Sequence, residues 1–190
     1  MKRILRKNRA RSGQAGFTLV ELLVVISIIG MLAGIMVPTI TKAMEAGKKA
    51  KAKGELTAIV AAVKAYKQEY GRFPGDPAAS NRLYSSNSSP KMEDLMKVLG
   101  GNAMTELDGQ IANLKGVRFF EGGQTNGILY DPWSRQYLVL VDSADTGSLT
   151  YTNGESVVNL RLSVLGICYG KDGVVSSETG KNIFSIDFLK

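Results

Sequence analysis

One uninterrupted apolar segment, residues 17–38, constrains this chain more than any other feature. It reads FTLVELLVVISIIGMLAGIMVP, and its only ionisable side chain is that of Glu21. As an α-helix, the segment extends roughly 33 Å at about 1.5 Å per residue, which matches the hydrocarbon thickness of a bilayer. A cleavable secretory signal has a shorter apolar core followed by a small-x-small site, whereas this run continues through Pro38 into a charged segment. The sequence therefore predicts a transmembrane helix.

The formal net charge of +7 is unevenly distributed along the 190 residues. Residues 1–16 carry six basic side chains and no acid, and residues 42–72 carry eight basic and three acidic side chains. The basic start favours a cytoplasmic N-terminus, although the lysines beyond the apolar run weaken that preference. After Arg72 the chain has ten basic and 13 acidic residues, so the C-terminal part is not expected to bind nucleic acid.

The absence of histidine and of a cysteine pair excludes several functional classes. Without histidine, Ser-His-Asp and Cys-His catalysis and imidazole metal sites are impossible. The single cysteine, Cys168, cannot form an intramolecular disulfide, and we interpret it as a small buried residue because no histidine can activate it. The sequence offers no other catalytic constellation, so we do not expect an enzyme.

Glu21 is the most informative residue of the apolar segment. A carboxylate in a membrane helix is costly unless it snorkels, is protonated or is paired, and the segment contains no Lys or Arg. A free amine at Phe17, produced by cleavage after Gly16, is a possible partner. The two residues are four positions apart in one helix, and in an assembly the amine of one subunit can meet Glu21 of the next.

The string Gly16-Phe17-Thr18-Leu19-Val20-Glu21, with its basic leader and following apolar helix, resembles the processing site of the type IV pilin and type II secretion pseudopilin family. The resemblance implies that a prepilin peptidase cleaves after Gly16, that the new N-terminus at Phe17 is N-methylated, and that Glu21 guides subunit docking. It also implies a single-pass protein of the bacterial inner membrane, with its N-terminus in the cytoplasm and its head in the periplasm.

The expected partners follow from the same resemblance. They are further copies of the chain in a helical filament, prepilin peptidase, an inner-membrane secretion or pilus assembly platform, and minor pseudopilins. Gly30 and Gly34 form a G-xxx-G pair that permits close helix packing. Pro38, which lies at the family's spacing from the cleavage point, should kink or loosen the helix.

Four regions are expected along the chain: a leader (1–16), a transmembrane helix (17–38), an extramembrane amphipathic helix (39–71) and a globular head (72–190). In the third region, apolar residues recur every three or four positions and should cover the head. Gly71 and Pro74 should end the helix. The stripe comprises Leu56, Ile59, Val60, Val63, Tyr66 and Tyr70, and we interpret its two tyrosines as core residues rather than as a ligand platform.

The head is predicted to be small and α+β, with an antiparallel sheet packed on the long helix. Residues 75–90 read as a surface loop, and residues 91–99 as a short helix. Candidate strands are Val117 to Glu121, Gln136 to Asp142, Val157 to Leu165 and Ile183 to Phe188.

Two further motifs resemble those of the major pseudopilins of type II secretion. Residues 131–137, DPWSRQY, are similar to that family's Asp-Pro-Trp-Gly-x-x-Tyr segment, with Ser134 in place of glycine. Residues 169–173, YGKDG, resemble its terminal Gly-x-Asp-Gly loop, which often holds calcium. Asp172, Glu178 and nearby carbonyls supply part of the six to eight oxygen ligands that calcium requires, but a solvated Gly/Asp turn is the preferred interpretation.

The sequence thus predicts a structural subunit of a type II secretion pseudopilus that requires no cofactor. A type IV pilin for adhesion, motility or DNA uptake is the alternative within the family. A membrane-tethered binding domain or enzyme is the alternative from a different class, although a tether needs no processing signal.

Overall fold

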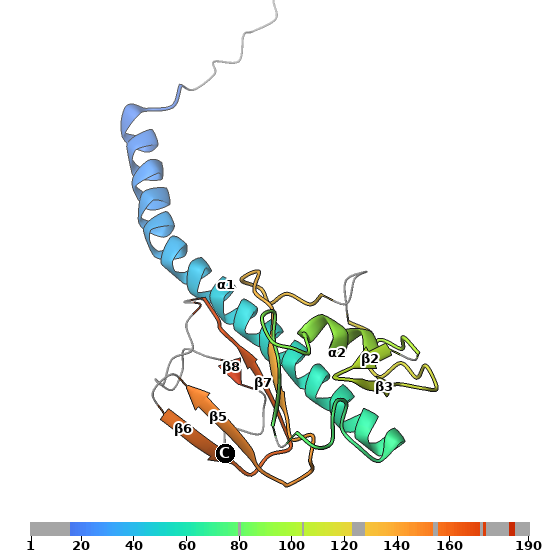
Figure 1. Cartoon of the computed structure of the whole chain (residues 1–190). Helices are drawn as coiled ribbons and strands as arrows, with labels where there is room; N and C mark the ends of the chain where they lie inside the picture. Colours follow the sequence, from blue (N-terminus) through green and yellow to red (C-terminus); the bar gives the residue numbers. More distant parts are fainter. Residues whose placement is uncertain are drawn as a thin grey trace, which may run out of the picture. The chain divides into compact units, whose positions relative to one another are not determined.

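A computed structural model describes residues 16–79, 81–103, 105–122, 128–153, 156–171, 173 and 183–184. The leader before Gly16, together with Asp172 and Glu178, lies outside the described residues. Two helices were assigned in the described part of the chain, the long α1 (Leu19–Tyr70) and the short α2 (Met92–Leu99) (Figure 1).

The strands form one four-stranded antiparallel sheet and two hairpins. The sheet has the order β1-β4-β7-β8, with β1 (Arg82–Tyr84), β4 (Leu138–Val141), β7 (Val164–Cys168) and β8 (Ile183–Phe184). One hairpin pairs β2 (Thr105–Leu107) with β3 (Gln110–Ala112), and the other pairs β5 (Leu149–Asn153) with β6 (Ser156–Leu160). The predicted α+β class, a long helix with a small antiparallel sheet, is confirmed.

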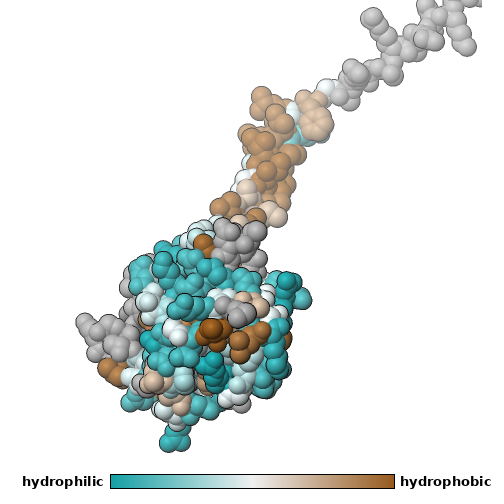
Figure 2. Space-filling model, turned by 45° about the vertical axis from the view of Figure 1, so that its right-hand side comes forward, coloured by the Kyte–Doolittle hydropathy of each residue, from teal (hydrophilic) through white to brown (hydrophobic). Residues whose placement is uncertain are grey.

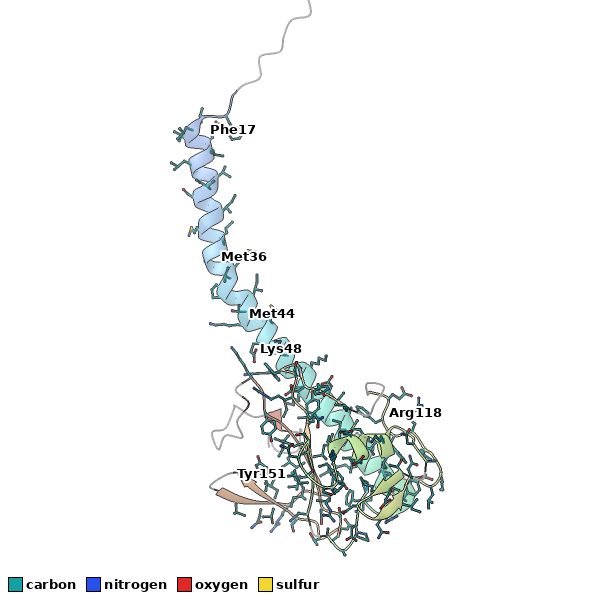
Figure 3. All side chains as sticks on the ribbon, turned by 45° about the horizontal axis from the view of Figure 1, so that its top comes forward. Phe17, Met36, Met44, Lys48, Arg118 and Tyr151 are labelled. Atoms are coloured by element: carbon teal, nitrogen blue, oxygen red, sulfur yellow. The ribbon has the colours of Figure 1, made fainter. Side chains whose placement is uncertain are left out.

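The chain divides into two compact units, one up to Met44 and one from Glu45 to Lys190. In the first unit, α1 is apolar on all sides, and its large side chains project away from the helix without cover (Figures 2 and 3). Phe17, for example, is 81% exposed. By length and composition, α1 is able to cross a membrane.

In the second unit, α1 forms one side of the core. Five residues of the predicted stripe, Leu56, Ile59, Val60, Val63 and Tyr66, are buried, and Tyr70 is half-buried against them. The helix ends at Tyr70, because the next residue is a glycine with φ of +70°, the left-handed conformation that commonly terminates helices. The stripe and the end of the helix are therefore confirmed.

The central strands β4 and β7 are buried on both faces. Val139 and Val141 face α1, whereas Leu138 and Leu140 join a second cluster that includes Leu149 of β5. In β7, Gly166 lies against α1 so closely that a Cβ atom there would be 2.9 Å from Leu56. The sheet is thus covered by α1 on one face and by side chains of the β5–β6 hairpin on the other.

Several of the predicted head elements differ from the structure. Residues 117–121 do not pair with any described strand. Phe119 and Phe120 both donate their N–H groups to the Leu99 carbonyl of α2, so this segment is bound to α2 and is not part of the sheet. The strand predicted over 157–165 is two strands, β6 and β7, separated at residues 161–163.

The other differences concern short strands. The region predicted as a loop, 75–90, contains β1, and the hairpin of β2 and β3 and the strand β5 were not foreseen. The other predicted elements are present in the structure. The 91–99 helix is α2, and β4 lies within the strand predicted over 136–142. The start of the last predicted strand is β8, and its residues 185–188 lie outside the described residues.

Candidate functional site

The first candidate site is the N-terminal end of α1, where Gly16, Phe17 and Glu21 were predicted to act. Thr18 immediately precedes the helix, and its backbone N–H and its hydroxyl both donate to Glu21 Oε2, at 2.8 and 2.7 Å. The Glu21 N–H in turn donates to Thr18 Oγ1 at 3.2 Å. This reciprocal pattern is a capping box, in which a threonine and the glutamate three residues later satisfy free N–H groups at the start of a helix.

Thr18 is a site residue that the sequence analysis missed, although the T-x-x-E spacing would have revealed it. The charged partner expected for Glu21 from the sequence is the Phe17 amine, within one helix or between neighbouring subunits. In the single chain the carboxylate already accepts two hydrogen bonds from its own helix start. Both bonds go to Oε2, and a carboxylate has two acceptor oxygens, so a docking partner can bind Glu21 while Thr18 stays bound.

The G-xxx-G pair and Pro38 lie further along the same helix. Gly30 and Gly34 are exposed, and a Cβ atom at either position would meet nothing within 4 Å. The helix continues through Pro38. Because proline lacks an N–H, the Gly34 carbonyl has no intrahelical donor four residues ahead. This part of α1 therefore presents an open face of small residues and one free carbonyl.

A second candidate site is the turn formed by residues 131–137, which immediately precedes β4. Asp131 is buried, and its Oδ1 accepts the N–H groups of Trp133 and Arg135 at 2.9 and 2.8 Å. Ser134 has a φ of +65°, so it adopts the left-handed conformation of the glycine it replaces. The turn therefore keeps a glycine-like backbone despite the substitution.

The same aspartate connects the turn to β7. The thiol of Cys168 donates to Asp131 Oδ2 at 3.1 Å, and the sulfur accepts the Gly170 N–H at 3.4 Å. Burial, together with this hydrogen bond, raises the pKa of Cys168 to about 12. The thiol is thus held protonated in the interior, which confirms its interpretation as a structural residue.

Alkaline pH is expected to destabilise the folded head through Cys168. An unfolded cysteine ionises near pH 8.5, whereas the folded thiol retains its proton up to about pH 12. The stabilising contribution of the neutral thiol is therefore fully present below about pH 8.5 and falls, by at most about 1.4 kcal/mol per pH unit, as the pH rises through this window. Melting midpoints between pH 8 and 11 should fall less steeply for Cys168→Ala than for the wild type. Equal slopes would contradict the shift.

Arg135 joins the turn to the loop that was considered for calcium. Its guanidinium donates to the carbonyls of Gly170 and Lys171, at 2.5 and 3.3 Å. At Gly173 a Cβ atom would lie 2.3 Å from the same guanidinium, so a larger residue there would displace the end of the Arg135 side chain. The carbonyl oxygens of Gly170 and Lys171, which are possible metal ligands, therefore already accept hydrogen bonds from the positive Arg135 side chain.

The described residues do not otherwise assemble a metal site. Across the described ranges, no group of three or more Cys, Asp or Glu side chains is close enough to hold an ion. Asp172 and Glu178, the side chains suggested for calcium, lie outside those ranges. In the part of the loop that the structure describes, Arg135 binds the Gly170 and Lys171 carbonyls.

These observations define a class of protein. An exposed apolar helix that starts beside a Gly-Phe bond and continues into the core of a small α+β head is the arrangement of pilin-like, membrane-anchored subunits. The comparison with protein families agrees, because residues 11–37 match the prokaryotic N-terminal methylation motif.

Individual relatives narrow the class to one family. The type II secretion system core protein G of Escherichia coli K12 is 31% identical over 140 residues, which cover 74% of this chain and 80% of the relative. The core protein G of Pseudomonas aeruginosa is 36% identical over 84 residues, 43% of this chain and 59% of the relative. This chain belongs to the family of type II secretion system core protein G.

A shorter stretch of the chain is similar to a type IV pilin. The type IV major pilin protein PilA of Myxococcus xanthus is 38% identical over 69 residues, 36% of this chain and 31% of the relative. No solved structure shows a significant match.

Proposed function

We propose that this chain is a pseudopilin, a structural subunit that assembles into the periplasmic pseudopilus of a type II secretion system. The observation that carries the proposal is the methylation motif at the start of α1, combined with the similarity to core protein G over most of the chain. A structural role is supported by the names of the relatives, one a core protein of a type II secretion system and one a major pilin. The chain is anchored in the inner membrane by α1, with the leader in the cytoplasm and the head in the periplasm.

The proposed maturation uses the residues at the start of α1. Prepilin peptidase cleaves after Gly16, and the amine of Phe17 becomes methylated. Cleavage leaves Thr18 and Glu21 in place, so the capping box persists in the mature chain. During assembly, the platform in the inner membrane and the minor pseudopilins bring copies together, and the Phe17 amine of one copy meets Glu21 of the next.

Mass spectrometry of the mature protein tests the proposal directly. We expect a chain that starts at N-methyl-Phe17 and lacks the 16 leader residues. Gly16→Ala should be processed better than a bulky replacement such as Gly16→Leu, whose product should keep the leader. A wild-type chain that retains its leader would overturn the proposal and favour a membrane-tethered domain.

The type IV pilin remains the second candidate, favoured by the Myxococcus similarity. Electron microscopy of the cell surface distinguishes the two functions. Long surface pili at native expression that disappear on deletion, with secretion of exoproteins unchanged, indicate a pilin. Loss of exoprotein secretion without loss of surface pili indicates a pseudopilin.

We further propose that the head is stable without calcium, because Arg135 supplies the positive charge that holds the Gly170 and Lys171 carbonyls. The melting midpoint should be the same in excess calcium and in chelator. Arg135→Met should lower the midpoint under both conditions. The expected loss in the free energy of unfolding is about 1 to 3 kcal/mol, because the Gly170 and Lys171 carbonyls lose their charge-assisted hydrogen bonds. A midpoint that rises with calcium in the wild type would overturn this proposal.

A further inference from the structure

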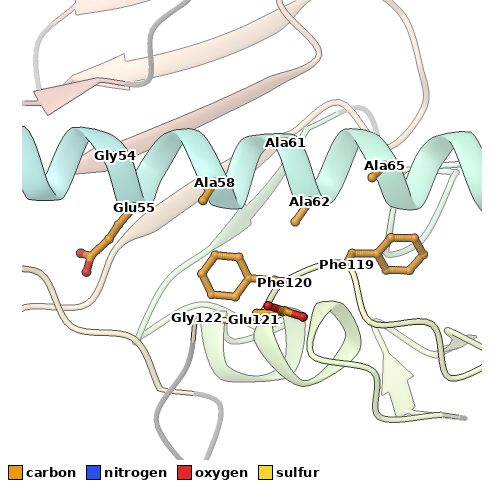
Figure 4. Close-up of a pocket in the computed structure, with 10 residues that line it drawn as sticks. All are labelled: Gly54, Glu55, Ala58, Ala61, Ala62, Ala65, Phe119, Phe120, Glu121 and Gly122. Carbon is orange, nitrogen blue, oxygen red and sulfur yellow. The ribbon is translucent and has the colours of Figure 1, made fainter.

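An apolar groove of about 590 Å³ runs along α1 in the second unit (Figure 4). Its floor consists of Gly54, Ala58, Ala61 and Ala65, which recur at intervals of four and three residues and so lie on one face of the helix. Three of the four are exposed, and Ala65 is half-buried. This face is opposite the stripe that packs into the core.

The far wall of the groove is fixed in place by the core. It is formed by Phe119 and Phe120, whose N–H groups both donate to the Leu99 carbonyl, at 2.8 and 3.0 Å. The Phe119 ring also packs edge-on against Tyr66, with centroids 5.5 Å apart. The backbone of this wall and the Phe119 ring are therefore held by contacts with α2 and α1.

The charges that line the groove are all negative. Glu55 and Glu121 are its only ionisable lining residues (Figure 4). The Glu55 carboxylate accepts the hydroxyl hydrogen bond of buried Tyr137, and its Oε1 lies 3.9 Å from Lys51 Nζ of the same chain. The attraction of the groove for a positively charged occupant therefore rests mainly on Glu121. Glu121 is exposed on the opposite side. An occupant should therefore be slender, partly apolar and positively charged.

One segment of the chain itself has this chemistry. Residues 47–53, GKKAKAK, which we name the basic stem, carry four lysines and no acid in a single helical stretch of α1. The other three residues are glycine and alanine; Ala52 is buried in the chain's own core, and Gly47 and Ala50 are exposed between the lysines. Small residues on both surfaces allow two helices to approach toward the short end of the usual 8–10 Å range. Lysine side chains can then lie along the apolar floor and place their amines at the acids.

We propose that this groove binds the basic stem of a second copy of the chain. The stem and the groove are different surfaces of the same molecule, so the contact is heterologous and each copy can both donate a stem and accept one. Contacts of this kind propagate into open helical assemblies. With parallel helices, the two copies are displaced by about 14 Å along the helix, from the separation of the two segments at about 1.5 Å per residue. The inference rests on the proposed function and assigns it a specific subunit contact.

Cysteine cross-linking of the full-length chain in its host membrane tests the contact. Two tagged variants are co-expressed, Ala50→Cys in the centre of the stem and Ala58→Cys on the groove floor. We expect a mixed cross-linked dimer, and little product from either variant alone. Ser148→Cys, an exposed position before β5 that does not line the groove, serves as the matched control and should not link to Ala50→Cys.

Substitutions that reverse the charge of the groove and of the stem test whether ion pairs stabilise the contact. Glu121→Lys should reduce the mixed cross-link about fivefold, the order expected for a charge pair at the edge of an interface. Combining it with Lys48→Glu and Lys49→Glu in the stem should restore the product. A reduction that the stem reversal does not restore would contradict the charge pairing, and an Ala58→Cys homodimer would show that two grooves face each other instead.

The result also separates this inference from the proposed function. Wild-type chains that are processed at Phe17 and form filaments, but give no mixed cross-link, would overturn the groove contact alone. Chains that retain the leader and form no filaments would overturn the proposed function as well.

Discussion

Replacing Glu21 by alanine should leave membrane insertion intact and reduce filament yield at least tenfold. Insertion depends on the apolar length of α1, which the substitution increases. Assembly depends on a partner for the Phe17 amine, and the apolar segment offers no other acid. The measurement is the amount of subunit in sheared or cross-linked filaments, relative to the amount in the membrane fraction.

The capping box provides the control for this experiment. Thr18→Ala removes the hydroxyl that bonds to Glu21 but keeps the carboxylate. It should weaken the start of the helix by about 1 kcal/mol, as for other lost N-caps, and have a small effect on assembly. If Thr18→Ala and Glu21→Ala reduce assembly equally, Glu21 acts as a cap and not as a docking residue. Normal filaments from Glu21→Ala would remove the docking role.

Asp131→Ala should cause the largest loss of head stability, about 3 to 5 kcal/mol. The substitution leaves the N–H groups of Trp133 and Arg135 and the thiol of Cys168 without their acceptor. Each is a hydrogen bond to a carboxylate in the interior, worth roughly 1.5 to 3 kcal/mol, and unsatisfied buried donors add a penalty. A loss of this size is a large part of the stability of a typical domain.

Urea unfolding of the full chain in detergent, followed by tyrosine and tryptophan fluorescence, measures this loss. Asp145→Ala is the matched control, because that aspartate pairs with Lys67 on the surface and its removal should cost less than about 1 kcal/mol. Similar losses for the two variants would contradict the assigned importance of the buried turn.

The parts of the fold that were predicted correctly are those with strong periodic signals. The apolar stripe of α1 extends over four turns, and α2 places its apolar residues on one face, so both helices were located within about a residue or two. The errors fall on short strands. Three-residue strands such as β1 are too short to show alternation, and their pairing depends on partners far away in the chain.

The central strand β4 was located although it lacks the usual pattern of a half-exposed strand. β4 reads LVLV because both of its faces are buried, which removes the polar–apolar alternation that marks a half-exposed strand. Phe119 and Phe120 follow the opposite pattern: their composition favours a strand, but packing against α1 and α2 determines their position. In both cases tertiary contacts decided the outcome.

The candidate site was predictable only where residues act locally. Gly16, Phe17 and Glu21 follow from a contiguous motif, and the T-x-x-E cap was readable from the same string. By contrast, the bond from Cys168 to Asp131 joins residues 37 positions apart, and Arg135 reaches 35 residues along the chain to Gly170. No sequence spacing encodes those contacts, because they depend on how β4 and β7 align.

The continuity of α1 has a mechanical consequence. The same helix that carries the apolar anchor residues supplies Leu56, Ile59, Val63 and Tyr66 to the interior of the head. These side chains are buried and spread over several turns of α1. Pulling the part of α1 beyond Glu45 out of the head would therefore expose them to water, so this segment cannot leave the head unless the head unfolds.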